Sequence, residues 1–347
     1  MKTLTTTKRT TRLAASLAII LALAATAARA ANPTWTGATN SYWSEPGNWN
    51  NANGKVPTSG WIMFEDLTDS SKLTVVITNA VVCTGGLQMN NIGTAEHPLA
   101  FTADPASASL QFGSKNGTFI GNYNGDAYVR LISGTYSTGT NDLFVGGNSH
   151  DRNAYLTIES PAQLDIGAEC KLARQSSLVN RGLIKTKSIT YNKGTATSTF
   201  TFDGGTLEAS AAGTLVADDS RIALDVTSNG GTIDAASYAV SVERPIADAS
   251  GETGKMTFAG GGSVTLAAQP TYTGVTTVEI GTTLVVPAAI AGNKLAFTIP
   301  AGTADGVYEV VRISGGESFA ADALENASLP GDANAKFFFN SAKTGIY

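Results

Sequence analysis

A short glycine phrase recurs in the second half of the chain. Residues 202–207 read Phe-Asp-Gly-Gly-Thr-Leu, residues 229–233 read Asn-Gly-Gly-Thr-Ile, and residues 261–264 read Gly-Gly-Ser-Val. The second glycines of the three phrases are 26 and 31 residues apart. Self-similarity at a period of about 20–50 residues is the sequence signature of a repeat architecture.

A second phrase occurs earlier in the chain. It reads Phe-Ile-Gly at 119–121, Phe-Val-Gly at 144–146 and Asp-Ile-Gly at 165–167, so its glycines are 25 and 21 residues apart. Apolar and polar residues alternate between these phrases, as in 128–132 and 154–158. Such alternation predicts short strands that each have one apolar face.

One such unit cannot bury its apolar face alone, so neighbouring units must stack. We therefore predict an all-β protein whose residues 99–290 form about eight coils of a parallel β-solenoid (β-helix). The coils should be right-handed, because parallel crossover connections almost always are. The alternative is an antiparallel sandwich or a pair of barrels.

Two regions flank the predicted coils. Residues 31–98 contain all four tryptophans and are predicted to be an N-terminal cap, because an open solenoid end exposes unpaired backbone and apolar core. Residues 291–347 contain three apolar runs separated by turns, which predicts a C-terminal β segment with antiparallel closing strands.

The composition agrees with this fold class. Only 15% of the 347 residues are charged, while 42% are hydrophobic and 37 are glycine. A helical bundle needs more Glu, Lys and Leu, and a disordered chain has fewer aliphatic and aromatic residues.

Residues 1–30 are predicted to be a signal peptide. A basic start is followed by an apolar stretch over 13–28 and by the small-residue site Ala28-Arg29-Ala30, with Ala25-Thr26-Ala27 as a second site. Its removal leaves 18 basic residues against 28 acidic ones, a net charge of −10. We expect a secreted or outer-surface protein, with the periplasm as an alternative, and no later membrane span. The acidic balance disfavours nucleic acid as a partner.

Two segments carry a resemblance to a known family. Residues 254–284, with the core Tyr272-Thr273-Gly274-Val275-Thr276-Thr277-Val278, resemble one autotransporter-associated β-strand repeat. The opening Trp35-Thr36-Gly37, followed by Trp43 and Asn48-Trp49, resembles the start of large exported bacterial repeat proteins. The resemblance implies a secreted, passenger-like β-helix with structural or adhesive roles. It covers about a fifth of the chain, with one clear copy and no translocating barrel.

The residues for catalysis are sparse. His97 and His150 lie in polar, loop-like stretches. The adjacent acids Asp218 and Asp219, followed by Arg221 and Asp225, form the nearest approach to the carboxylate pair of a glycosidase. Neighbouring residues of one strand point to opposite faces, so a charged turn is the simpler interpretation.

Arg181, Lys185 and Lys187 with Asp203 could imitate a lyase site, although a solvated strand face is the simpler interpretation. Motifs for calcium, phosphate or a nucleophile elbow are absent from the sequence. The prediction is therefore no catalytic residue, no metal and no cofactor. Cys83 and Cys170 are predicted to be two separate buried thiols, with a single disulfide as the alternative.

We expect a non-enzymatic surface or matrix protein that contacts glycans or other surface proteins. The alternatives are a β-helical polysaccharide lyase or glycoside hydrolase, and a carbohydrate-binding module that uses the tryptophans. Trp35 and Trp49 are predicted to be buried in the cap, with Trp61 starting a strand that faces the core. Tyr42 and Trp43 are the candidate binding residues, because Trp43 is predicted to present an exposed ring.

Overall fold

The structure is a computed structural model that describes residues 32–50, 52–113, 117–122, 125–147, 152–288, 290, 295–304, 306–315, 318–319 and 337–347. The predicted signal peptide lies outside these residues. Residues 33–347 form one compact unit. Strands dominate the described residues, and their helical elements are two single 3-10 turns, η1 (Pro46–Asn48) and η2 (Ser70–Lys72). None of the described helices is long and apolar enough to cross a membrane.

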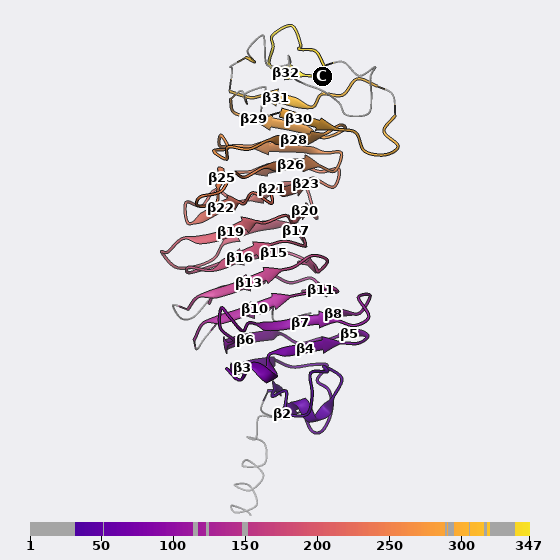
Figure 1. Cartoon of the computed structure of the whole chain (residues 1–347), viewed down its shortest axis with the longest axis vertical. Helices are drawn as coiled ribbons and strands as arrows, with labels where there is room; N and C mark the ends of the chain where they lie inside the picture. The colour runs from indigo at the N-terminus through magenta and orange to yellow at the C-terminus, as the bar shows by residue number, and fades with distance from the viewer. Residues whose placement is uncertain are drawn as a thin grey trace, which may run out of the picture. The chain divides into compact units, whose positions relative to one another are not determined.

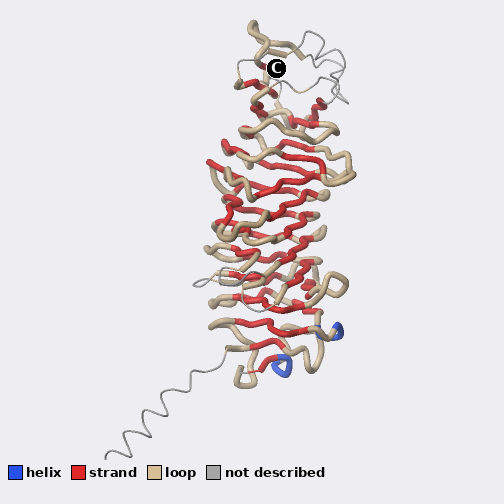
Figure 2. Tube along the Cα trace, turned by 90° about the vertical axis from the view of Figure 1, so that its left-hand side faces the viewer, coloured by secondary structure: helices blue, strands red, loops and turns tan. Residues whose placement is uncertain are grey.

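The strands of residues 33–347 stack in three parallel ladders (Figures 1 and 2). Ladder 1 comprises β4 (Thr74–Ile77), β7 (Leu99–Ala103), β10 (Ala127–Leu131), β13 (Ala154–Ile158), β16 (Ser177–Asn180), β19 (Ser198–Phe202), β22 (Ile222–Val226) and β25 (Ile246–Asp248).

Ladder 2 is the ten-stranded sheet of β5 (Ala80–Val82), β8 (Ser109–Gln111), β11 (Thr135–Ser137), β14 (Gln163–Asp165), β17 (Leu183–Thr186), β20 (Thr206–Ala209), β23 (Gly231–Asp234), β26 (Met256–Ala259), β28 (Thr276–Glu279) and β30 (Leu295–Thr298). Ladder 3 comprises β3 (Ile62–Leu67), β6 (Leu87–Ile92), β9 (Thr118–Ile120), β12 (Leu143–Val145), β15 (Glu169–Leu172), β18 (Ser188–Tyr191), β21 (Gly213–Val216), β24 (Ala239–Val242), β27 (Ser263–Leu266), β29 (Thr283–Val286) and β31 (Val311–Ile313).

Each complete coil contributes one strand to each ladder, and the described residues contain eight such coils, from β4 to β27. Two further coils contribute β28 with β29 and β30 with β31. The parallel β-solenoid predicted from the repeats is confirmed, and the antiparallel sandwich is excluded. The ladders begin before residue 99, since β4 and β5 already pair with β7 and β8. The handedness stays a prediction.

Alternation explains why these short segments are strands. Along β10, β13, β19 and β22 every second side chain is buried. Equivalent buried positions stack from coil to coil, as in the series Val129, Leu156, Leu178, Phe200, Leu224 and Ile246. Full burial of such side chains stabilises the fold by about 1.5–3 kcal/mol each, so the interior of the coils is one continuous apolar column.

The glycine phrases mark corners of the coils, though not always the same corner. Gly205 and Gly231 lie at the start of ladder 2 strands, whereas Gly262 precedes β27 in ladder 3. Similarly, Gly121 and Gly146 follow paired strands of ladder 3, while 165–167 belongs to ladder 2. Each of the two apparent periods therefore mixed two corners, because all three corners of the coil use glycine.

Both ends of ladder 3 are closed by antiparallel strands. At the N-terminal end, β1 (Thr34–Trp35) pairs antiparallel with β2 (Trp49–Asn50) and parallel with β3. At the other end, β31 pairs antiparallel with β32 (Gly345–Ile346). Reversal of strand direction ends the parallel ladder at each of these places. The division into a cap at 31–98 and a closing β segment at 291–347 stays a prediction.

Candidate functional site

The N-terminal cap contains a buried tryptophan cluster. The ring centroids of Trp43 and Trp49 are 4.7 Å apart, those of Trp35 and Trp49 are 5.1 Å apart, and Phe64 lies within 6.2 Å of all three. The burial predicted for Trp35 and Trp49 is confirmed. The cluster covers the first coil, because Phe64 also contacts Phe101 of the next coil at 5.5 Å.

The prediction of an exposed Trp43 ring is wrong, since the residue is only 1% exposed. Residues 41–43 run beside β4: the Val76 amide donates to Ser41 O at 2.7 Å, and the Trp43 amide donates to Val76 O at 2.9 Å. In this extended pairing alternate side chains point to opposite sides. Tyr42 therefore points outward, 47% exposed, and Trp43 points into the cluster. Ligand binding at Tyr42 stays a prediction.

Asn48 organises the turn of the cap, a role that its residue type and position in the sequence did not indicate. Its buried Oδ1 accepts hydrogen bonds from the amides of Thr39 and Asn40, and its Nδ2 donates to Asn40 Oδ1 and to Tyr42 O. The side-chain amide thus replaces backbone pairing that an irregular loop lacks.

Trp61 lies outside the buried cluster. The core-facing strand begins at Ile62, while the half-buried Trp61 ring lies over Gly86, where a Cβ would come within 2.4 Å of it. Its centroid is 5.9 Å from that of Phe119. The predicted core-facing strand is therefore present, but it begins one residue later than predicted, at Ile62, and Trp61 itself is half-buried.

Aromatic side chains also stack along the outer faces of two ladders. Phe119 and Phe144 stack at 4.4 Å on ladder 3, and Tyr128 and Tyr155 stack at 4.4 Å on ladder 1. Lys171 Nζ lies 5.3 Å from the Phe144 ring centroid. These ring faces are turned toward neighbouring coils, so the stacks join coils and do not form a platform for a ligand.

The four acidic and basic residues around Asp218 do not form a carboxylate pair. Arg221 engages Asp219 with two nitrogens, at 2.8 and 2.5 Å, and lies 4.2 Å from the centroid of the Tyr191 ring. Asp218 faces Arg244 at 3.6 Å. Asp225 is on ladder 1, where burial raises its pKa. The interpretation as a charged turn fits this arrangement.

The basic residues considered for a lyase site are also dispersed. Arg181 bridges Glu159, at 3.0 Å, and Asp203, at 2.6 Å, and Arg130 extends this row to a further coil at 2.6 Å from Glu159. Lys185 instead pairs with Glu208 at 2.5 Å on ladder 2. Lys187, the third of these basic residues, lies apart from both groups of ion pairs, at a hollow on ladder 3.

This hollow exists because one corner of a coil is short. A single residue, Lys187, connects β17 to β18, whereas three residues connect β14 to β15 and three connect β20 to β21. β18 and β21 consequently pair at one position, Ile189 with Val216, although β15 and β18 pair at four. The register shifts between Thr214 and Val216 where β21 meets β24.

The resulting recess, which we call the corner hollow, has a volume of about 510 Å³. Three carboxylates, one ammonium group and several hydroxyls line it: Glu169, Asp218, Glu243, Lys187, Ser188, Thr190 and Thr214. Lys187 is exposed and has no ion-pair partner within the described part of the chain. The hollow therefore offers hydrogen-bond acceptors and a cation to a ligand lying on the surface of the coils.

Cys83, Cys170 and His97 occupy buried or solvated positions. Both cysteines are buried and free, and burial raises the pKa of each thiol to about 12. His97 is exposed in a turn, and His150 lies outside the described residues. Among the described residues, no group of three or more His, Cys, Asp or Glu side chains is arranged to hold a metal ion.

Comparison with protein-family models, with curated proteins and with solved structures found no match for this chain.

Proposed function

We propose that the protein is a non-enzymatic β-solenoid that acts at the cell surface or in the extracellular matrix, where it contacts glycans or other surface proteins. The observation that carries the proposal is the corner hollow. This hollow is a recess of about 510 Å³ that polar and charged side chains surround.

The chemistry of the hollow suits a polar, shallowly bound partner. Carboxylates accept hydrogen bonds from sugar hydroxyls, and Lys187 and the Ser and Thr hydroxyls donate them. The neighbouring outer positions continue this character, since Ser241 Oγ lies 3.4 Å from Thr214 Oγ1 and Thr265 follows in register. A glycan lying along ladder 3 would meet hydroxyl groups from successive coils.

Export and the surface location rest on the sequence. The signal-peptide pattern supports secretion, and the resemblance to the autotransporter-associated repeat supports a passenger-like role. Within the resembling segment, Tyr272 and Thr276 are buried and their hydroxyls lie 2.7 Å apart. Asp248 accepts hydrogen bonds from the amide and the hydroxyl of Thr273. The motif therefore builds a corner of the solenoid, consistent with a structural repeat.

The test is binding of the purified protein to a panel of immobilised neutral, acidic and amino-sugar polysaccharides. Glu243→Lys should weaken the binding of a retained polysaccharide about tenfold or more, because it removes an acceptor and reverses a charge in the hollow. Glu96→Lys makes the same charge change at an exposed position in the turn after β6 and serves as the control. Equal binding by both variants, or no binding by the unchanged protein, would contradict the proposal.

The second candidate is a polysaccharide-degrading enzyme, and the observation in its favour is the gathering of Glu169, Asp218 and Glu243 around one hollow. Such an enzyme would release reducing ends or unsaturated sugars from one of the same polysaccharides, and Glu169→Gln or Glu243→Gln would abolish the release. The burial of Trp35, Trp43 and Trp49 does not favour the third alternative, a module that binds sugar through the tryptophan cluster.

A further inference from the structure

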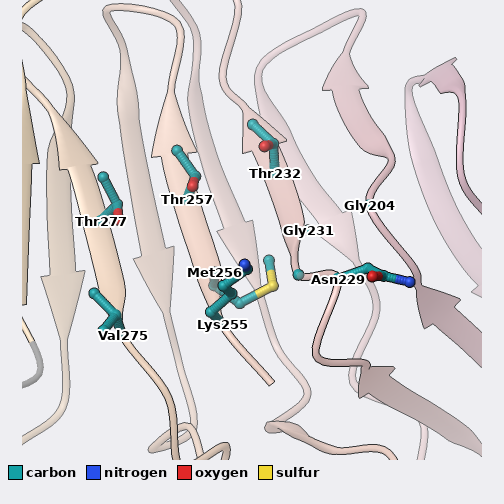
Figure 3. A pocket seen from close by; sticks show the side chains of 10 residues that line it. Gly204, Asn229, Gly231, Thr232, Lys255, Met256, Thr257, Val275 and Thr277 are labelled. Atoms are coloured by element: carbon teal, nitrogen blue, oxygen red, sulfur yellow. The ribbon is translucent and has the colours of Figure 1, made fainter. Parts of the chain in front are cut away.

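A second, smaller hollow lies on ladder 2 (Figure 3), and it shares no lining residue with the corner hollow. Thr232, Thr257 and Thr277 stand in a row on three adjacent strands, β23, β26 and β28, because the sheet register pairs each threonine with the next. Adjacent strands are about 4.8 Å apart, so the row offers three evenly spaced hydroxyls. The hollow beside them has a volume of about 120 Å³.

Two glycines, Gly230 and Gly231, form the corner beside this hollow. A Cβ at residue 231 would come within 2.5 Å of the Phe202 side chain. At residue 230 the backbone has φ +87°, and a Cβ would lie 2.8 Å from Lys255 Cγ. The aliphatic part of Lys255 thus lies across the glycine corner, with its charged end at the hollow.

The free charge at this site is positive, although the whole chain is acidic. Lys255 is exposed and has no ion-pair partner among the described residues. Asp203, next to the lining residue Gly204, is engaged by Arg181, Thr227 and Asn229. Glu252, three residues before Lys255, accepts a hydrogen bond from the amide of Ser228 at 2.8 Å. A ligand carboxylate would therefore find Lys255 available.

An apolar side chain completes the site. Val275, 43% exposed, forms the wall beside the threonine row. A sugar ring has an apolar C–H face, several hydroxyls and, in uronic acids, one carboxylate. Val275 offers a surface for the apolar face, the threonine row can hydrogen-bond the hydroxyls, and Lys255 can pair with the carboxylate.

We propose that this hollow binds a carboxylate-bearing sugar residue of a polysaccharide that lies on the outer face of ladder 2. Pockets that enclose drug-sized ligands span about 300–1,000 Å³, so a hollow of about 120 Å³ holds one residue of a longer chain. The site is independent of the proposed function, because the corner hollow belongs to another ladder and contains different residues.

The experiment is calorimetric titration of the purified protein with oligomers of galacturonate, glucuronate and mannuronate, and with the neutral galactose, glucose and mannose oligomers of the same length. One acidic oligomer should bind at least about tenfold more tightly than its neutral counterpart. Lys255→Gln should remove that preference, whereas Lys255→Arg should retain most of it. Lys55→Gln, at another exposed lysine that forms no ion pair with the described residues, is the matched control and should bind like the unchanged protein.

Thr257→Val tests the hydroxyl row separately, because it removes one hydroxyl and keeps the shape of the side chain. It should weaken both the acidic and the neutral oligomer. Absence of binding by every acidic oligomer, or equal binding by Lys255→Gln, would overturn the inference. Equal binding of acetate and the acidic oligomers would also overturn it, because the site would then recognise an anion without the sugar. Glu243→Lys should leave this binding unchanged, which separates it from the proposed function.

Discussion

The tryptophan cluster and the corner hollow are two irregular places in the described part of the solenoid. In the cap, three tryptophan rings and Phe64 fill the irregular space, and the Asn48 side chain satisfies the turn around them. At the corner hollow, β18 and β21 pair at one position and charged side chains line the recess. One interruption is packed and the other is open to solvent.

This difference predicts which substitutions should change stability and which should change binding. Groups in the cap are held by several contacts each, so their replacement should mainly change the free energy of unfolding. Groups at the corner hollow have few contacts within the chain, so their replacement should mainly change binding. The following measurements test whether substitutions in the two regions differ in this way.

The largest effect is expected in the tryptophan cluster. Trp49→Ala should lower the free energy of unfolding of the N-terminal coils by about 3–5 kcal/mol, because it leaves a cavity between Trp35, Trp43 and Phe64. Urea unfolding followed by tryptophan fluorescence measures this change. Tyr42→Ala, which removes the exposed neighbouring ring, should cost less than about 1 kcal/mol. Similar losses for both variants would show that the cluster does not close the end.

A pair of glycine substitutions compares the two regions directly. A Cβ at Gly85, where the first complete coil meets the segment before β3, would lie 1.5 Å from Gly60 O, so Gly85→Ala must displace backbone and should cost about 2–3 kcal/mol. Gly213, at the corner hollow, has φ +114° and no atom within 4 Å of its Cβ position. Gly213→Ala should therefore cost only the backbone strain, about 1 kcal/mol. Thermal unfolding of both variants gives the order, and a reversed order would contradict an open corner.

Lowering the pH should destabilise the coils around Asp203 before it destabilises the uncharged tryptophan cluster. Burial raises the pKa of Asp203, but hydrogen bonds from Arg181, Thr227 and Asn229 outweigh burial and hold its pKa below the ordinary value. The stabilisation from Asp203 is complete above pH of about 4 and is lost as the pH falls through the lower pKa of the folded state. Asp203→Asn should lower stability at pH 7 and reduce the loss of stability between pH of about 4 and 2. Urea unfolding across this range measures both effects, and identical pH profiles would contradict this role.

The smallest effect on stability is expected at the corner hollow itself. Glu243→Lys should change the free energy of unfolding by no more than about 0.5 kcal/mol, since no salt bridge in the described residues includes Glu243. Chemical denaturation measures this value beside Glu96→Lys. A loss above about 2 kcal/mol would mean that the hollow is part of the packed structure.

The repeated alternation made the solenoid predictable, because buried positions such as Leu156 and Leu178 recur at every coil and cannot be satisfied within one unit. The cap was predictable from the position of the tryptophans, but the orientation of Trp43 was not. That orientation depends on the pairing of residues 41–43 with β4, which is a long-range contact. Burial of Trp35 and Trp49 followed from their turn contexts.

The corner hollow was not predictable from residue types alone. Asp218 and Lys187 were both considered, but as members of different sites. Their approach depends on the length of one corner, Lys187 alone between β17 and β18, which becomes visible only after each strand is assigned to its ladder. The threonine row on ladder 2 depends in the same way on register.

Native-state hydrogen exchange tests most directly whether the cap is closed and the corner open. The amides of Trp43 and Asn48 donate to Val76 O and Glu45 O within the packed end, whereas residues 212–214 are exposed beside the weakly paired β18. Exchange at 212–214 should be at least about a hundredfold faster than at Trp43 and Asn48, because opening there disrupts few buried contacts. Equal protection of the two regions, or faster exchange in the cap, would contradict the account.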